Sequence, residues 1–418
     1  MKVVVLNEKF REVLGVFKKV LKNKNKWGGV QNITLLIQKG LDGGFYLVFR
    51  TWDWENWFEG KIECFIKFDD GEAVDESCKD WRVTVNYFEL VGALKQFSKK
   101  QTVILEKQGG RLVLLSENVK LFLDLREEMT VEPNFSLKEN VVSEFRLVFD
   151  SEDLSDAIKC VDFARDEKGN FEFTKGYYLD LIEIKDDKVY LVATNSHRLS
   201  WYRLTPKVKS GNISIPGLCL SSEQSLILKT ICEFSQNVVD IQINELNDKE
   251  KVIITFQAFP FVYKGIRQVY GFPDWLGLTP KEFLGSMVVT ADIAKEIVEF
   301  VRSGRDLTKT LAKERGVRGN FLGRVQLEFK GGENRVKMEI WDGDLPSKKV
   351  MEREFLCEWS GGDFLVAFDI IYFSDIVSVL QDGFRIKFTH PAGITQFEDL
   401  KKDCWVHWLM PVDLSKLS

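Results

Sequence analysis

The chain has 418 residues, which is enough for about three ordinary domains. Hydrophobic residues make up 44% and charged residues 29% of it, as in folded globular proteins, so disordered and fibrous classes are excluded. The formal net charge of −5 excludes a uniformly basic nucleic-acid coat protein. No apolar run approaches the roughly 20 residues of a membrane span, and the N-terminus lacks a secretory signal pattern, so we expect a cytoplasmic protein without membrane contact.

The seven cysteines are odd in number, scattered, and never spaced as CxxC. This pattern favours reduced, buried thiols over disulfides or zinc ligands.

In chain order, the first predicted elements are a strand over residues 2–6 and an amphipathic helix over residues 7–21. The same pair recurs at residues 145–163 and 287–301. Each helix places three apolar residues at the i, i+4, i+7 spacing of one buried face. They are Phe10, Leu14 and Phe17, then Leu154, Ile158 and Val161, then Ile293, Ile297 and Phe300. Three such pairs indicate three units built on one plan.

The second half of each unit repeats the plan, again as a short strand followed by a helix. These pairs lie at residues 81–97, 212–234 and 363–380, with the middle strand expected over residues 212–216. Alternating β-type runs joined by turn-like segments fill the rest, as hairpins require. The polar connectors between units predict domains over residues 1–138, 139–283 and 284–418.

Helices on antiparallel strands place the chain in the α+β class. If the units join edge to edge, the next unit covers each unpaired strand edge, and the sheets continue between neighbours. Closure into a ring is the natural end point of such joining, with the helices on the inside.

The most specific stretch is Leu191 to Leu204, which reads as a hairpin with a polar corner at Thr194, Asn195 and Ser196. His197 and Arg198 lie at its tip. Local physics alone leaves two interpretations open, a recognition surface and an ordinary solvated turn.

Basic residues gather in two places on this acidic chain. Five lysines lie within nine residues that contain no acid, and residues 302–324 hold seven basic residues against Asp306 and Glu314. Such patches could contact phosphate, and a solvated helix end explains them equally well.

Enzyme motifs are missing from the sequence. The three histidines form no metal-ligand spacing, and Gly60 and Lys61 lack the rest of a phosphate-binding loop. Asp53 and Glu55 could share one face of a strand, which leaves a metal-dependent nuclease or glycosidase as an alternative. The polar face of an edge strand is the favoured explanation of this pair.

Five segments together resemble the bacterial DNA polymerase III beta sliding clamp family, and they occur in the family's order. The central VATNSHRLSWYRL (192–204) is similar to the family's VATDGHRLA-type string. The others are GYYLDL (176–181), YGFPDW (270–275), AFDIIYFSDIVSVL (367–380) and LMPVDL (409–414).

The resemblance implies three repeated clamp-type domains and a head-to-tail homodimer that closes into a six-domain ring around duplex DNA. It implies a non-catalytic processivity factor without cofactor or metal, which contacts phosphates without reading sequence. DNA polymerase and a clamp loader are the implied partners, bound through linear peptides. The implied DNA-binding residues are Lys22, Lys24, Lys26, Tyr177 and Tyr178, and the implied dimer residues are Leu121 and Leu123. A monomeric, clamp-like interaction module that does not encircle DNA is the alternative.

The resemblance also implies a peptide pocket between the middle and last domains. Its residues are Leu179, Thr194, His197, Arg198, Leu199, Pro273, Leu278, Tyr372, Ala392, Ile394, Met410, Pro411, Val412 and Leu414. Asn195 and Ser196 replace the family's Asp-Gly, Asp369 replaces its Asn, and Asp413 replaces a basic residue. We expect the corner to lose glycine's access to positive φ, and acidic peptides to be disfavoured.

Overall fold

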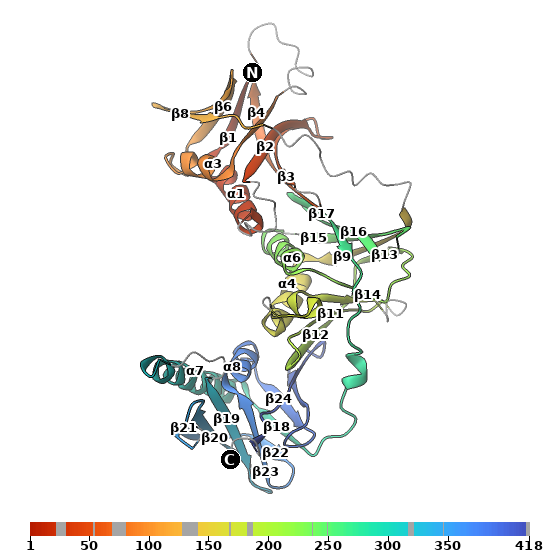
Figure 1. The fold of residues 1–418 in the computed structure, drawn as a ribbon, viewed down its shortest axis with the longest axis vertical. Helices are drawn as coiled ribbons and strands as arrows, with labels where there is room; N and C mark the ends of the chain where they lie inside the picture. Colours follow the sequence, from red (N-terminus) through yellow and green to blue (C-terminus); the bar gives the residue numbers. More distant parts are fainter. Residues whose placement is uncertain are drawn as a thin grey trace. The chain divides into compact units, whose positions relative to one another are not determined.

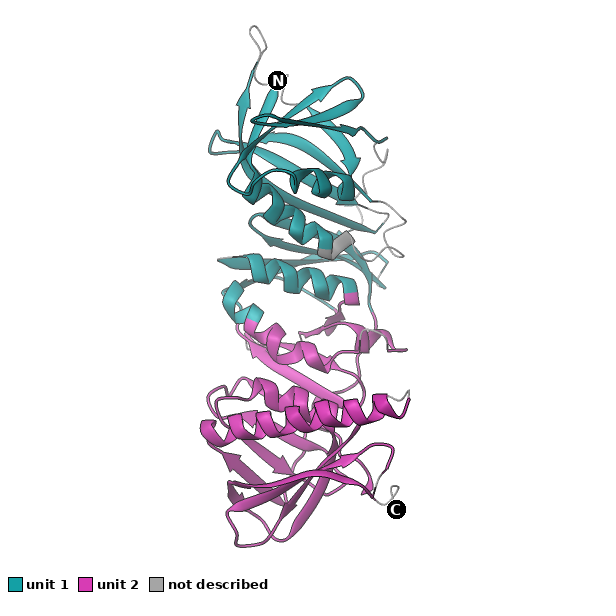
Figure 2. Ribbon diagram, turned by 90° about the vertical axis from the view of Figure 1, so that its left-hand side faces the viewer, with its two compact units in different colours: residues 1–155, 206–214, 223–269 teal, residues 156–205, 215–222, 270–418 magenta. Residues whose placement is uncertain are grey.

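The computed structural model describes residues 1–21, 31–52, 55–68, 81–127, 141–166, 169–181, 187–235, 237–248, 250–316, 322–345 and 347–414 (Figure 1). It separates into two compact units (Figure 2). Unit 1 holds residues 1–155, 206–214 and 223–269, and unit 2 holds residues 156–205, 215–222 and 270–418. No helix in the described ranges is long and apolar enough to cross a membrane.

Unit 1 is built on one antiparallel sheet of 13 strands. Its strands are β1 (Lys2–Leu6), β2 (Asn32–Lys39), β3 (Phe45–Trp52), β4 (Asn56–Lys67), β5 (Arg82–Asn86), β6 (Thr102–Gln108), β7 (Arg111–Ser116), β8 (Val119–Asp124), β9 (Val141–Asp150), β13 (Val208–Gly211), β15 (Val238–Leu246), β16 (Lys251–Ala258) and β17 (Phe261–Gln268). The helices α1 (Asn7–Leu21) and α3 (Tyr87–Leu94) belong to this unit. The unit division falls inside α4 (Ser151–Val161) and at the first residue of α6 (Ser222–Phe234).

The pairing of β4 with β17 joins the first predicted repeat to the second. Residues 56–60 of β4 pair antiparallel with residues 261–265 of β17, so the sheet is continuous across the predicted boundary. Gly60 lets α1 pack closely on the sheet at this join, because a Cβ there would lie 3.0 Å from side-chain atoms of Val13 and Phe17. Gly60, which lacks the rest of a phosphate-binding loop, is therefore a packing residue beneath α1.

Unit 2 has a nine-stranded sheet and a four-stranded sheet. The larger holds β10 (Tyr178–Asp180), β11 (Val189–Thr194), β12 (Arg198–Leu204), β14 (Gly217–Cys219), β18 (Gly285–Val289), β22 (Glu358–Ser360), β24 (Phe384–Phe388), β25 (Thr395–Asp399) and β26 (Trp405–Leu409). The smaller holds β19 (Gly323–Phe329), β20 (Arg335–Asp342), β21 (Lys349–Leu356) and β23 (Phe364–Asp369). The helical elements are η2 (Asp162–Ala164), α5 (Glu172–Lys175), η4 (Leu276–Leu278), α7 (Ala291–Glu314) and α8 (Ile370–Val379).

Antiparallel pairing of β12 with β26 joins the second predicted repeat to the third, from Arg198 opposite Leu409 to Tyr202 opposite Trp405. The expectation that sheets continue between neighbouring repeats is therefore confirmed at both junctions. The predicted division into three domains stays a prediction.

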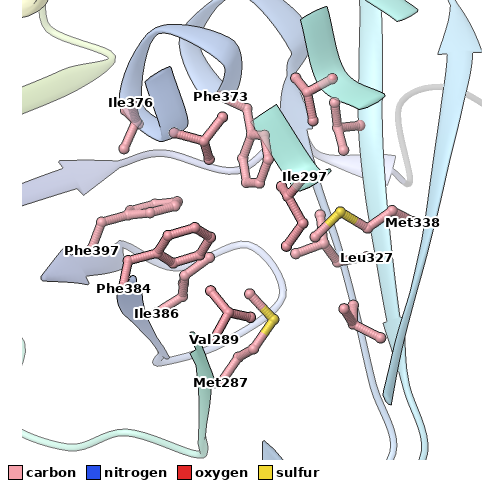
Figure 3. Close-up of a cluster of buried hydrophobic side chains, with 14 of the residues drawn as sticks. Met287, Val289, Ile297, Leu327, Met338, Phe373, Ile376, Phe384, Ile386 and Phe397 are labelled. Carbon is pink, nitrogen blue, oxygen red and sulfur yellow. The ribbon is translucent and has the colours of Figure 1, made fainter. Parts of the chain in front are cut away.

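The core of unit 2 forms where α7 and α8 meet the sheets (Figure 3). Ile297 of α7 and Phe373 of α8 are fully buried there, together with Met287 of β18 and Phe384 of β24. The i, i+4, i+7 pattern correctly identified this helix face, since Ile297 is 0% and Phe300 6% exposed.

Two elements differ from the sequence prediction. Residues 212–216 form no strand, and β13 and β14 lie on either side of them, because Pro216 has no N–H to donate to a ladder. Helix α7 continues to Glu314, well beyond its predicted end at 301. Gly304 lets this extension approach the smaller sheet, since a Cβ there would lie 1.9 Å from Ile340 Cδ1.

Candidate functional site

The corner between β11 and β12 is organised by side chains that bond the backbone. Asn195 Oδ1 accepts hydrogen bonds from the N–H groups of His197 (3.1 Å) and Arg198 (3.0 Å). Thr194 Oγ1 donates to the Arg198 carbonyl at 2.8 Å. Ser196 has a φ of 73°, so a non-glycine residue occupies the left-handed conformation that glycine favours. The expectation that the corner loses positive φ without glycine is therefore wrong, since Ser196 adopts it at the cost of local backbone strain.

Arg198 is directed from this corner into a cage of α8 and η2 residues. Its Nη1 lies 2.7 Å from Asp375 Oδ2, and its Cζ lies 4.5 Å from the Tyr372 ring centroid and 5.4 Å from that of Phe163. The residue is only 8% exposed. An ion pair and two ring faces therefore fix a cation whose loss of solvation must be offset by these contacts.

The C-terminal segment is fastened beside the corner by two backbone hydrogen bonds. The N–H of Met410 donates to the His197 carbonyl at 3.0 Å, and the N–H of Val412 donates to the Ala367 carbonyl at 2.8 Å. Met410 nevertheless remains 43% exposed. Its flexible thioether is thus presented to solvent from a fixed backbone, an arrangement that suits contact with varied apolar side chains.

The predicted pocket residues all fall in unit 2 but differ in accessibility. The buried ones are Leu179, Thr194, Arg198 and Leu199; the half-buried ones are Tyr372, Ile394, Pro411, Val412 and Leu414; the exposed ones are His197, Pro273, Leu278, Ala392 and Met410. Leu199 and Ile394 belong to an apolar cluster with Trp275 and Trp408. The buried members support the site from beneath, and the exposed members are those that a ligand can reach.

Sequence reasoning missed the roles of several residues that build the site. Trp275 Nε1 donates to Asp180 Oδ2 at 2.6 Å and fixes the loop that carries Pro273. Asp369 caps α8, since its Oδ1 accepts from the N–H groups of Ile371 (2.8 Å) and Tyr372 (3.2 Å). Aspartate performs here the capping that asparagine can perform, although burial raises the pKa of its carboxyl. Pairing of Asp375 with Arg198 had no local signal because 177 residues separate them.

No protein-family model matches the sequence, and no curated protein matches it. Solved structures do match, over 99% of this chain. A Caulobacter crescentus beta sliding clamp is 18% identical, with 99% of its chain covered and a TM-score of 0.75. A Bartonella birtlesii sliding clamp bound to griselimycin is 17% identical, with 100% covered and a TM-score of 0.76. The DNA polymerase beta subunit of Streptococcus pyogenes is 14% identical, with 100% covered and a TM-score of 0.76.

The chain has the sliding-clamp fold. The expected α+β clamp architecture is thereby confirmed, and the resemblance read from five short segments extends over the whole chain at the level of structure.

Within the sliding-clamp fold, the predicted DNA-contacting residues have different outcomes. Lys22, Lys24 and Lys26 lie outside the described residues. Tyr177 and Tyr178 are 1% and 5% exposed, and the Tyr177 hydroxyl donates to Asp162 Oδ1 at 2.7 Å. Both tyrosines therefore pack at the start of a strand with little side-chain surface accessible, and their contact with DNA stays a prediction.

The predicted dimer residues lie on β8, an edge strand of the sheet in unit 1. Leu121 is half-buried and Leu123 is 8% exposed, so both mainly pack inward. Phe122, between them, is 52% exposed. Phe122 was not identified from the sequence as an exposed residue of an edge strand. The alternation of side chains along a strand could have indicated it, because it places Phe122 on the face opposite Leu121 and Leu123.

The alternative carboxylate site of Asp53 and Glu55 is only partly within the described residues and stays untested. Asp53 lies outside the described residues. Across the part of the chain that the structure describes, no group of three His, Cys, Asp or Glu side chains could hold a metal ion.

Proposed function

We propose that the chain is a DNA sliding clamp, a non-catalytic processivity factor that encircles duplex DNA in the cytoplasm, in association with the nucleoid. The observation that carries the proposal is the fold match over 99% of this chain and at least 99% of each clamp chain compared. Such a protein acts by topology, since a tethered polymerase meets its template at high effective concentration. It needs neither cofactor nor metal.

The pocket around the β11–β12 corner is the proposed tether for polymerase, clamp loader and other partners. Its exposed apolar residues, Met410, Leu278 and Pro273, would take the side chains of an extended peptide. In the Caulobacter clamp, polyethylene glycol is bound at a region assigned as its beta-motif tether, and the Bartonella clamp is bound to griselimycin. We take griselimycin as the probe of this site, on the proposal that it binds the tether pocket.

Ring closure would use two different free strand edges, as a head-to-tail dimer requires. One is β8 of unit 1, and the other is β21, at the edge of the smaller sheet of unit 2. Apolar Phe122 on β8 and Leu356 on β21 are 52% and 60% exposed. Both strands carry exposed side chains of both charges, Lys120 and Asp124 on β8 and Glu352 and Arg353 on β21, so charge pairing can set the register of their contact.

Exposed cations are the proposed phosphate contacts. Lys18 of α1 and Arg302, Lys309 and Lys313 of α7 all have exposed side chains. Contacts of this type give affinity without sequence specificity and allow sliding, with strong dependence on salt.

Analytical ultracentrifugation tests the ring against the alternative of a monomeric interaction module. We expect a dimer at micromolar concentration, and dissociation of the Phe122→Glu variant because it places a carboxylate in the apolar edge contact. Glu117→Gln, in the adjacent turn, is the matched control. A wild-type monomer would favour the module.

A further inference from the structure

A column of aromatic and guanidinium side chains in contact runs from the core of unit 2 to the tip of the β11–β12 corner. The ring centroids of His407 on β26 and Phe163 on η2 are 5.0 Å apart. The Arg198 guanidinium lies 5.4 Å from the Phe163 centroid and 4.5 Å from that of Tyr372. Tyr372 in turn stacks at 6.1 Å on His197. Five side chains from four separate segments are thus in continuous ring or cation–π contact.

The two ends of this column differ in exposure. His407 is 0% exposed and Arg198 8%, Phe163 and Tyr372 are half-buried, and His197 is exposed. His197 and the small accessible part of Arg198 can touch a ligand directly. The inner end can act on a ligand only through Arg198.

The inner residues restrict the guanidinium in a way that its ion pair does not. Asp375 contacts Nη1 at 2.7 Å, and among the described residues the buried Nε has no hydrogen-bond partner. A single ion pair leaves the guanidinium plane free to rotate, whereas a ring face holds that plane. The Phe163 ring is in turn supported by His407, whose two ring nitrogens also have no partner among the described residues.

His407 therefore behaves as an aromatic ring rather than as a polar group. Complete burial, and secondarily the nearby Arg198 charge, lower its pKa well below the usual range, so it stays neutral near pH 7. A neutral ring against Phe163 adds no repulsion to the Arg198 cation.

We propose that Phe163 and His407 are positioning residues that set how Arg198 is presented to a bound peptide. Because Asp375 neutralises the guanidinium, its remaining donors suit a neutral acceptor such as a peptide carbonyl better than an acidic side chain. The preferred ligand class is thus an extended apolar peptide. The part of this inference that concerns ligand binding rests on the proposed function, but the geometry of Arg198 can be tested without it.

The first test is the Arg198 Nε–H resonance in ¹⁵N-arginine NMR spectra, assigned with Arg198→Lys. We expect Phe163→Leu and His407→Leu to shift this resonance and to accelerate its exchange with solvent, because ring-current shift and plane restriction are lost. Phe163→Tyr should preserve both. Phe300→Leu is the matched control, since Phe300 is a buried phenylalanine of the same core that lies outside the column. An Arg198 resonance unchanged in both leucine variants overturns the proposal.

The second test is calorimetric titration with griselimycin. We expect Phe163→Leu to weaken binding about fivefold, the effect of one cation–π contact, with Phe163→Tyr near wild type and Phe300→Leu unchanged. A folded Phe163→Leu protein that binds as tightly as wild type overturns the role in ligand binding. If wild-type protein does not bind griselimycin, the proposed pocket function fails, and the resonance test alone decides whether Phe163 and His407 position Arg198.

Discussion

Arg198 Nη1 and Asp375 Oδ2 are 2.7 Å apart, and they join a corner of one sequence repeat to a helix of the next. The arginine side chain is 7% exposed and the aspartate 28%. This pair therefore contributes to the integrity of the proposed pocket as well as to its chemistry.

Removing the aspartate charge should destabilise unit 2. Asp375→Asn leaves the Arg198 charge desolvated without its counter-ion, and we expect a loss of about 2 kcal/mol in the free energy of unfolding. Urea denaturation measures it. Lys9→Gln, which breaks an ion pair whose members are 65% and 49% exposed, is the control and should change little. Equal effects of the two substitutions would contradict the structural role of Arg198.

The strained corner predicts a stabilising substitution. Ser196 lies at a φ of 73°, where a side chain costs about 1 kcal/mol that glycine does not incur. Ser196→Gly should therefore raise the melting temperature modestly. The relief of strain in the folded state is partly offset by the greater conformational entropy of glycine in the unfolded chain. Ser196→Ala retains the strain and should give no gain. A lower melting temperature for Ser196→Gly would show that the serine side chain outweighs the strain.

Acid should destabilise the fold through His407. Its pKa is lowered in the folded state, so below about pH 6.5 the unfolded chain binds a proton that the folded chain does not. This contribution to stability is complete above that pH and falls by about 1.4 kcal/mol per pH unit below it. Thermal unfolding between pH 7.5 and 5 measures the slope. His407→Phe should flatten the profile, and a slope unchanged in that variant would assign acid sensitivity to other groups.

The exposed members of the pocket should control affinity for peptides. We expect Met410→Ala combined with Leu199→Ala to weaken griselimycin binding and to leave ring assembly intact. Because Leu199 is only 7% exposed, its truncation also costs about 2 to 4 kcal/mol of stability, so Met410→Ala alone is the cleaner test. Sedimentation reports assembly in both variants, and unchanged affinity in both would contradict the pocket assignment.

Local patterns were sufficient to predict the repeating framework. The β11–β12 hairpin appeared where Leu191–Leu204 predicted it, with Thr194 opposite Leu199. Helix faces followed the apolar spacing, as the buried Phe10 and Phe17 illustrate. These features depend on periodicity within a short segment, which the sequence contains directly.

Long-range partners could not be predicted in the same way. Nothing near Ser200 indicates that it pairs with His407, and Arg198 carries no local sign of Asp375. Tyr177 and Tyr178 were assigned to DNA from a motif, whereas their burial depends on packing that only the folded chain shows. The positive φ of Ser196 could not be predicted either. A glycine at this position would have indicated it, whereas a serine does not.

Retention on DNA circles tests the central claim, that this chain encircles duplex DNA, most directly. The protein would be loaded on nicked circular DNA by a purified clamp loader, isolated by gel filtration, and followed before and after one restriction cut. We predict retention on the circle and rapid loss after linearisation, as the clamp slides off the free ends. Equal half-lives on circular and linear DNA would contradict the account.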